Sequence, residues 1–171
     1  MIPAMNYGIS ISDSAYIAFL DADDLWLPNK QAQQIQLLQE DPQLDAATCL
    51  TANFSADASG ALVVQPAHES VMFTSTTFRS DAFDRFGQLD PGSTHFTWLY
   101  RWWGQARMSG IRTAHLPSVG TYRRLHADNS WRVHREQAHR ELLTEVRRHA
   151  QSKARAAAGQ SLPSANDGAS P

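Results

Sequence analysis

The feature that most constrains this chain is a short apolar run that leads directly into a cluster of carboxylates. Residues 16–20 (Tyr-Ile-Ala-Phe-Leu) form a run of aromatic, branched and apolar side chains, the pattern of a buried strand. Asp21, Asp23 and Asp24 follow it at once. Three carboxylates so close together repel one another, and a fold keeps them beside an apolar strand only when water, donors or a cation compensates. The run therefore predicts a strand that ends in a charged turn.

Strands and helices alternate along the rest of the chain. Pro28 opens a predicted helix that Asp41 and Pro42 end. Further strands are predicted over residues 46–54, 61–64, 71–79, 113–116 and 119–124, and further helices over residues 4–12, 81–86, 95–109 and 131–149. This alternation indicates an α/β fold with a mainly parallel sheet and flanking helices. In such sheets ligands bind beyond the C-terminal ends of the strands, where we expect the carboxylates to lie.

The length indicates one folded domain with a tail. A chain of 171 residues and 19.0 kDa is long enough to bury a core without disulfides or a structural metal. We place the folded domain at residues 1–150. Residues 151–171 are rich in Ala, Ser, Gly and Pro, and Leu162 is their one bulky apolar side chain. This segment is predicted to be a disordered, dispensable tail, because it buries too little surface to offset its ordering entropy.

Cysteine content and hydropathy indicate the compartment. Cys49 is the single cysteine, so an intramolecular disulfide and a multi-cysteine zinc site are both excluded. No apolar run is long enough to span a bilayer, and the N-terminus lacks the pattern of a secretory signal. We therefore expect a protein without a transmembrane segment in the reducing cytoplasm, free or at the periphery of a membrane.

The net charge of −2 conceals an asymmetry between the two parts of the chain. Residues 1–70 carry nine acidic side chains and one basic side chain, Lys30, whereas residues 71–171 carry eight acidic and fourteen basic ones. This balance argues against a nucleic-acid-binding protein. It suits a metal site near a phosphate-binding surface, and the alternative is that the basic half is a solvated helix.

The spacing of the carboxylates suits a hard cation. Asp-x-Asp on a tight turn can direct oxygens toward one Mg²⁺ or Mn²⁺ ion, which would neutralise charge on a diphosphate. The alternative is a solvated turn in which one aspartate caps the helix that Pro28 opens.

The chain also resembles a known family. The similarity runs in order from residue 4 to residue 130 and covers residues 6–9, 16–30, 78–90, 109–112, 116–117 and 122–130. These segments are similar to an inverting family 2 glycosyltransferase of the GT-A type. The resemblance implies a nucleotide-diphospho-sugar donor, a saccharide or other hydroxyl acceptor, and a divalent metal.

The resemblance also implies roles for individual residues. Asp21 would lie near the ribose or sugar of the donor, Asp23 would bind the metal, and Asp24 would support the site or cap a helix. His126 would be a metal or phosphate ligand, and Arg123 a charge partner for the leaving group. The alternative for His126 is a histidine on a surface loop.

The sequence departs from the family pattern in two places. It starts inside the helix that follows the family's first base-binding elements, which implies a truncated domain whose exposed edge a partner could cover. Where the family has an acidic pair before its acceptor helix, this chain has Thr94 and His95. Imidazole can take the proton of an acceptor hydroxyl and threonine cannot, so His95 is the candidate catalytic base. The alternative is that His95 lies at the N-terminus of a helix and takes no part in the reaction.

Two tryptophans are candidates for the acceptor side. Trp98 and Trp102 lie one helical turn apart and could form an aromatic wall for a sugar. The alternative is a pair of core aromatics.

The leading hypothesis is a glycosyltransferase that transfers little or nothing as an isolated chain. The second is a non-catalytic remnant or interaction module with the same fold. An aspartate-nucleophile phosphatase ranks third, because Leu25 stands where a small residue is needed. A zinc hydrolase ranks last, because His134 and His139 are five residues apart on a predicted helix and face different sides.

Overall fold

The computed structural model describes residues 1–93, 97–126, 136, 139–144, 146–147 and 150–151. In this part of the chain the named elements are α1 (Ile2–Ile11), β1 (Tyr16–Ala18), β2 (Leu25–Trp26), α2 (Lys30–Glu40), β3 (Ala46–Ala56), β4 (Leu62–Val64), the 3₁₀ turn η1 (Phe73–Ser75), β5 (Thr76–Arg79), α3 (Ala82–Phe86), α4 (Trp98–Met108) and β6 (Thr113–Arg124). None of the helices in these ranges is long and apolar enough to span a bilayer.

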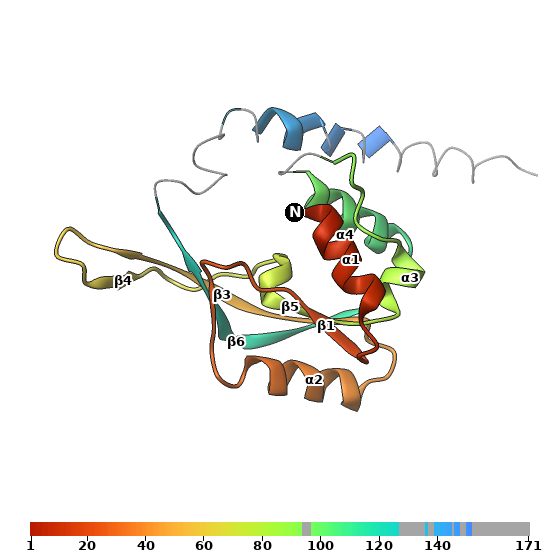
Figure 1. Ribbon diagram of the computed structural model, residues 1–171, viewed down its shortest axis with the longest axis horizontal. Coiled ribbons are helices and arrows are strands. Elements are labelled where there is room, and N and C mark those ends of the chain that lie inside the picture. Colours follow the sequence, from red (N-terminus) through yellow and green to blue (C-terminus); the bar gives the residue numbers. More distant parts are fainter. Residues whose placement is uncertain (94–96, 127–135, 137–138, 145, 148–149, 152–171) are drawn as a thin grey trace, which may run out of the picture.

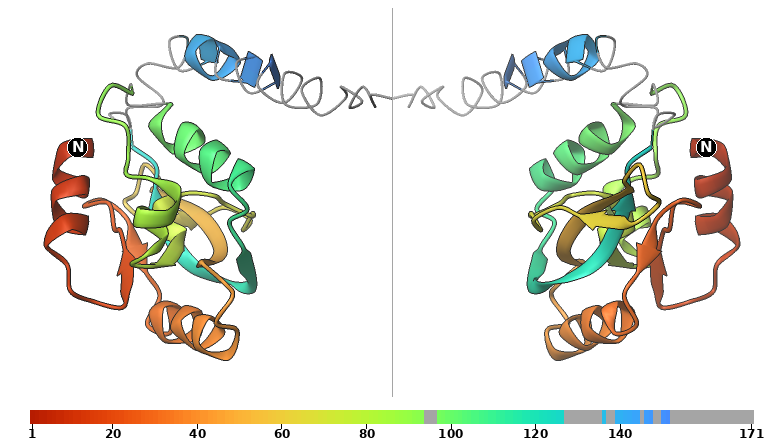
Figure 2. Two further views of the ribbon diagram at one scale, coloured as in Figure 1. Left: turned by 90° about the vertical axis from the view of Figure 1, so that its right-hand side faces the viewer. Right: turned by 90° about the vertical axis from the view of Figure 1, so that its left-hand side faces the viewer.

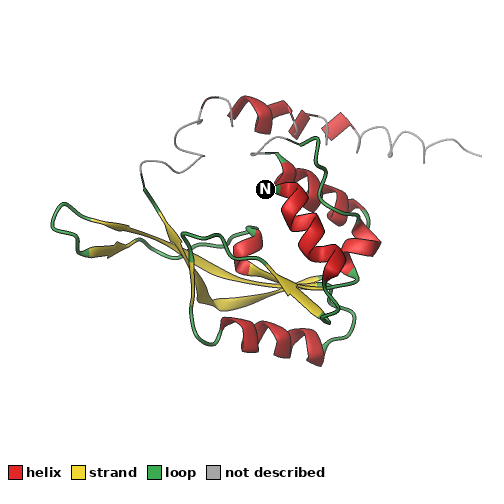
Figure 3. Ribbon diagram, in the orientation of Figure 1, coloured by secondary structure: helices red, strands yellow, loops and turns green. Residues whose placement is uncertain are grey.

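A curled sheet with helices on both faces forms the body of the molecule (Figures 1 and 3). The strand order is β1-β5-β3-β6-β2, and β4 pairs with the far part of β3 to form a hairpin that projects from the body. The sheet is mixed and mostly antiparallel: β3 and β6 run parallel, and the other named pairs are antiparallel. The α/β class is confirmed, whereas the expectation of a mainly parallel sheet is wrong.

The mostly antiparallel orientation of the strands follows from the connection between β3 and β5. Parallel neighbours need a crossover, usually a helix, that carries the chain back to the starting edge. The segment after β3 holds the β4 hairpin and the short η1 turn, with no crossover α-helix, and β5 then pairs antiparallel to β3. A mainly parallel sheet would need a helix where the hairpin lies.

The charged turn lies at the end of the sheet that the sequence predicts. Because β1 is antiparallel to β5 and β5 is antiparallel to β3, the strands β1, β3 and β6 all point the same way. In the strand order β1 and β2 occupy opposite ends. The connecting residues 19–24 therefore cross the C-terminal ends of these strands, and Asp21, Asp23 and Asp24 lie on this crossing.

The helices form two layers, and the larger core lies under three of them. Helix α2 covers one face of the sheet, and α1, α3 and α4 cover the other (Figures 1 and 2). The core on the second face is mainly aromatic, with Phe73 only 2% and Phe78 0% exposed. In α4 the side chains of Leu99, Trp103 and Ala106 lie one helical turn apart and are buried on the face that meets this core.

Most of the predicted element boundaries are confirmed. Helices α3 and α4 end beside Gly87 and Gly110, whose φ angles of +90° and +85° only glycine adopts without strain. The strands predicted over residues 46–54 and 61–64 pair with each other as a hairpin. The two strands predicted over residues 113–116 and 119–124 are one strand, β6, because an irregular register opposite Cys49 to Thr51 accommodates the residues between them.

Helix α2 buries polar side chains against the sheet. Lys30 is 1% exposed, and its ammonium donates to Gln34 Oε1 at 2.9 Å and lies 4.4 Å from the centre of the Trp26 ring. Gln34 in turn donates to the carbonyls of Ala47 and Ser75 at 2.9 and 2.8 Å. Burial lowers the pKa of Lys30 to about 8, although the nearby Cys49 thiol opposes the shift.

The buried lysine predicts that the protein becomes more stable as the pH rises above 8. Between pH 8 and 10.5 the folded state releases the Lys30 proton while the unfolded state still holds it, so unfolding takes up a proton and stability rises with pH. Burial also raises the pKa of Cys49, whose unfolded thiol ionises near 9.0, and this reduces the gain above that pH. We expect the free energy of unfolding, measured with urea, to rise by about 1 kcal/mol between pH 7.5 and 9. Lys30→Met should remove the rise, and an unchanged slope in that variant would contradict the assignment.

Candidate functional site

The acidic turn is held against the end of β6. The amide of Asp24 donates to the carbonyl of Asp21 at 3.1 Å and closes the turn. The next residues form β2, in which Leu25 pairs with Tyr122 of β6. The turn therefore lies beside the C-terminal end of β6, where residues 125–126 leave the sheet.

Asp23 and His126 form the central contact of the site. The Nε2 atom of His126 lies 2.9 Å from Oδ2 of Asp23, and the two side chains are 39% and 41% exposed. This hydrogen bond holds the pKa of Asp23 below its usual range, and Arg123 acts in the same direction. The two residues are 103 positions apart in the chain, so the fold creates the contact. A carboxylate oxygen and an imidazole nitrogen thus reach one accessible point.

Asp24 is buried and serves the structure of the turn. It is 5% exposed, and its Oδ1 accepts a hydrogen bond from the amide of Arg124 at 3.1 Å. Its Oδ2 has no hydrogen-bond partner among the described residues. Burial raises the pKa of Asp24 to about 6, and repulsion by Asp21 and Asp23 adds to the shift. Helix α2 has no side-chain cap, so the alternative of a solvated turn with a helix-capping aspartate is wrong for Asp24.

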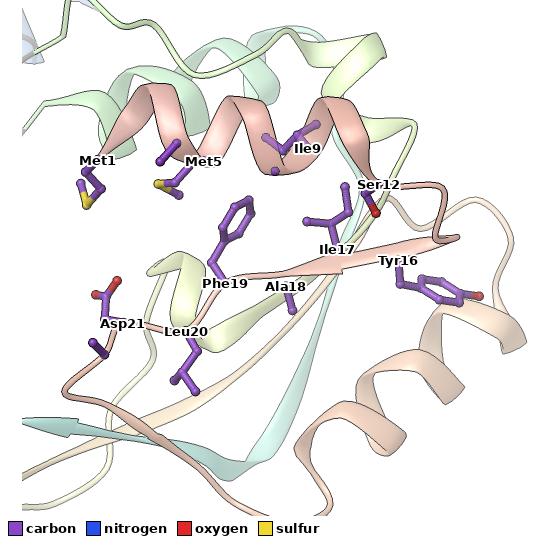
Figure 4. A pocket seen from close by; sticks show the side chains of 13 residues that line it. Met1, Met5, Ile9, Ser12, Tyr16, Ile17, Ala18, Phe19, Leu20 and Asp21 are labelled. Carbon is purple, nitrogen blue, oxygen red and sulfur yellow. The ribbon is translucent and has the colours of Figure 1, made fainter.

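Asp21 lies on the exposed side of the turn and reaches a pocket. Loss of hydration raises its pKa, Asp23 adds to the rise, and Arg123 opposes it. The pocket measures about 600 Å³ and lies between α1 and the β1 segment, with Asp21 at one end (Figure 4). Its walls are largely apolar, with Met5 and Phe19 facing each other from the two elements. Within the described residues β1 pairs only with β5, so its other edge lies open; a partner at this edge stays a prediction.

Arg123 is the positive charge that acts on all three carboxylates of the turn. It lowers the pKa of Asp21, Asp23 and Asp24 alike, although it is not the main influence on any of them. Its guanidinium is therefore close enough to act on the whole cluster, and an anion that approached the turn would meet it.

The donor set fits a hard cation that brings further ligands with it. In the described part of the chain, no group of three or more His, Cys, Asp or Glu side chains could hold a metal ion. Asp23 and His126 supply two donors at one point when a cation replaces the proton of the hydrogen bond between them. Mg²⁺ and similar cations are commonly held by one or two protein ligands, with water and substrate phosphates completing the shell. The residues present fit that arrangement and do not form a closed metal cage.

The two candidate acceptor tryptophans lie in the core. Trp98 and Trp102 are 8% and 4% exposed, and both rings pack against Phe73 with centroids 5.0 and 5.2 Å away. The indole N–H of Trp102 donates to the carbonyl of Gly87 at 2.7 Å. This burial favours the core alternative, and contact with an acceptor stays a prediction.

Several predicted features lie outside the described residues. They include Thr94 and the candidate base His95, most of the predicted helix over 131–149 with His134, and nearly all of the 151–171 tail with Leu162. The domain boundary at residue 150 and the role of His95 therefore stay predictions.

Sequence reasoning missed one residue of the site. Arg124 donates from its backbone amide to Asp24 and from Nε to the carbonyl of Asp23 at 3.2 Å. The sequence signal that could have indicated Arg124 is its position between Arg123 and His126. Adjacent residues on a strand point to opposite faces, however, so this position did not predict that Arg123 and Arg124 both act on the site.

Comparison with known proteins gives one family. The sequence model of the family described as "Glycosyl transferase family 2" matches residues 1–102, more than half of the chain. This match covers the acidic turn and ends inside α4, before β6. A search of the curated proteins found no match.

Proposed function

The chain belongs to glycosyl transferase family 2, and on this premise we propose that it transfers a sugar from a nucleotide-diphospho-sugar donor to an acceptor hydroxyl. Membership implies the GT-A type of α/β fold. The observation that carries the proposal is the 2.9 Å contact between Asp23 and His126 at the C-terminal ends of the strands. It brings together a residue inside the family match and one beyond it, at the place where such sheets bind ligands.

Each residue of the site has a proposed part in binding the donor. Asp23 and His126 hold a divalent metal, Mn²⁺ or Mg²⁺, which supplies positive charge to the diphosphate when bound. Arg123 pairs with the remaining phosphate charge. Asp21 accepts a hydrogen bond from a hydroxyl of the ribose or sugar. Asp24 keeps the turn in place, because its carboxylate accepts the Arg124 amide.

The proposed reaction is a direct displacement with inversion at the anomeric carbon. The acceptor oxygen forms a bond to that carbon while the bond from the carbon to the diphosphate oxygen breaks. The hydroxyl proton passes to the imidazole of His95, and the electron pair leaves with the nucleoside diphosphate. Arg123 stabilises the charge that develops on this leaving group.

A non-catalytic module with this fold remains the second candidate. It is favoured by Thr94 and His95, which stand where the resemblance implies an acidic pair. Such a module would keep the fold but would not bind the donor.

Neutralising Asp23 is expected to weaken Mn²⁺ binding about tenfold or more, because the variant loses one of two protein ligands. Asp24→Asn is the matched control: it removes the same charge from a neighbouring residue that is buried and bonded to Arg124. Titration of the full chain with Mn²⁺ by calorimetry, with and without a nucleoside diphosphate, measures both variants. Equal losses, or a loss in Asp24→Asn alone, would contradict the assignment.

Donor binding separates the two candidate functions. A panel of nucleotide sugars with Mn²⁺ and hydroxyl acceptors tests transfer by wild type, Asp23→Asn and His95→Ala. Turnover that both substitutions abolish supports the enzyme. Metal-dependent binding of a nucleoside diphosphate with little transfer is the result expected of the glycosyltransferase as an isolated chain, whereas a folded chain that binds no nucleoside diphosphate supports the module.

A further inference from the structure

Arg124 connects the acidic turn to β3, the central strand of the sheet. Its Nε donates to the carbonyl of Asp23 at 3.2 Å, and its guanidinium lies 5.1 Å from the centre of the Phe54 ring. Phe54 belongs to β3, is 3% exposed and pairs with Arg124 in the parallel ladder. The exposed arginine thus bridges a fixed aromatic ring and the backbone of a proposed metal ligand.

The backbone on both sides of Arg124 is also fixed. Its own amide donates to Asp24, and the amide of Leu125 donates to the carbonyl of Phe54 at 2.7 Å. The Arg124 side chain therefore extends from a hydrogen-bonded backbone and packs on the buried ring of Phe54. The Asp23 peptide that it contacts lies in a turn, and a turn has more freedom than the strands beside it.

The electrostatic pattern separates Arg124 from its neighbour. The charge of Arg123 lowers the pKa of all three carboxylates, whereas Arg124 affects Asp24 through its backbone amide. Arg123 therefore acts on the cluster by charge, whereas Arg124 makes two direct hydrogen bonds to the turn.

We propose that Arg124 is a positioning residue, which holds the Asp23 peptide so that the Asp23 carboxylate and the His126 imidazole converge on one cation. This inference rests on the proposed function, since it concerns the same site. It assigns the arginine no contact with the donor or the metal.

Titration with Mn²⁺ alone distinguishes a positioning role of Arg124 from an effect of its charge. Arg124→Gln removes the contact to the Asp23 carbonyl, and we expect it to bind Mn²⁺ about tenfold more weakly than wild type. Arg123→Gln is the matched control, because it removes the same positive charge one residue away. A cation should bind that variant as tightly as wild type, or more tightly. Arg124→Lys keeps the charge without the Nε–H and should behave like Arg124→Gln.

Hydrogen exchange tests the inference without a metal. In the full chain, Arg124→Gln should speed amide exchange in residues 22–25 relative to wild type, while Arg123→Gln should not, and both should keep the wild-type urea midpoint. Unchanged exchange in Arg124→Gln overturns the proposal, whatever its Mn²⁺ affinity. Wild-type or tighter Mn²⁺ binding by Arg124→Gln also overturns it. If wild type binds no Mn²⁺, the proposed metal site fails, and the exchange result alone decides the role of Arg124.

Discussion

Asp45→Ala is expected to lower the free energy of unfolding by about 3 kcal/mol. Asp45 immediately precedes β3 and is 1% exposed; its carboxylate accepts the amide of Arg112 at 2.8 Å and pairs with the guanidinium of Arg85. Its backbone also joins the sheet, since its carbonyl accepts the amide of Arg79 at 2.8 Å. The alanine variant leaves the Arg112 amide without its acceptor and leaves a cavity. Urea unfolding at neutral pH measures the loss.

Arg85→Ala is the informative comparison for Asp45. The arginine side chain is 53% exposed, so solvent screens its charge, and its removal should cost about 1 kcal/mol. A double-mutant cycle with Asp45→Ala then isolates the ion pair from the amide contact. A loss below 1 kcal/mol in Asp45→Ala, or equal losses in both single variants, would show that the Arg112 contact contributes little.

Local patterns predicted the elements of the fold because each has a local physical cause. The helix that Pro28 opens, the hairpin at Gly60 and the helix end at Gly87 follow from backbone preferences within a few residues. The relative orientation of the strands in the sheet could not be predicted in this way. It depends on which strand β5 joins after the hairpin, and pairing between strands is a property of the whole chain.

The same distinction applies to the candidate site. The position of Asp21, Asp23 and Asp24 at a strand end could be predicted, because an apolar strand followed by carboxylates is a local signal. The burial of Asp24 could not, because it comes from β6, a hundred residues away along the chain. Likewise the sequence contains His126, but only the curled sheet places its ring beside Asp23.

The tryptophans of α4 show the limit of a spacing argument. Trp98 and Trp102 lie one turn apart, which suits a wall for a sugar and a core stripe equally well. The contacts with Phe73 distinguish the two, and Phe73 comes from the η1 turn, where the sequence predicted the first part of a strand over residues 71–79. A stripe of aromatic residues therefore predicts burial more safely than it predicts a ligand.

Gly120→Ala is expected to lower the free energy of unfolding by about 3 kcal/mol or more. A Cβ atom at this buried position of β6 would lie 2.6 Å from Sγ of Cys49 and 3.0 Å from Cγ of Lys30. Both neighbours are about 1% exposed, so neither can move into solvent. The carbonyl of Gly120 accepts the amide of Leu27 at 2.9 Å, so a shift of β6 would also disturb the segment that follows the acidic turn. Urea unfolding measures the loss, and Mn²⁺ titration measures any effect on the site.

Two further variants show whether close packing is the cause. Gly8→Ala makes the same chemical change in α1, where no heavy atom lies within 4 Å of the new Cβ, and it should stabilise the helix by about 0.5 to 1 kcal/mol. Cys49→Ala removes the sulfur that the methyl group introduced by Gly120→Ala would meet. The double variant Gly120→Ala with Cys49→Ala should therefore lose less free energy of unfolding than the sum of the two single losses, by about 1 kcal/mol. Strict additivity would mean that the glycine is required for its backbone and not for its missing side chain.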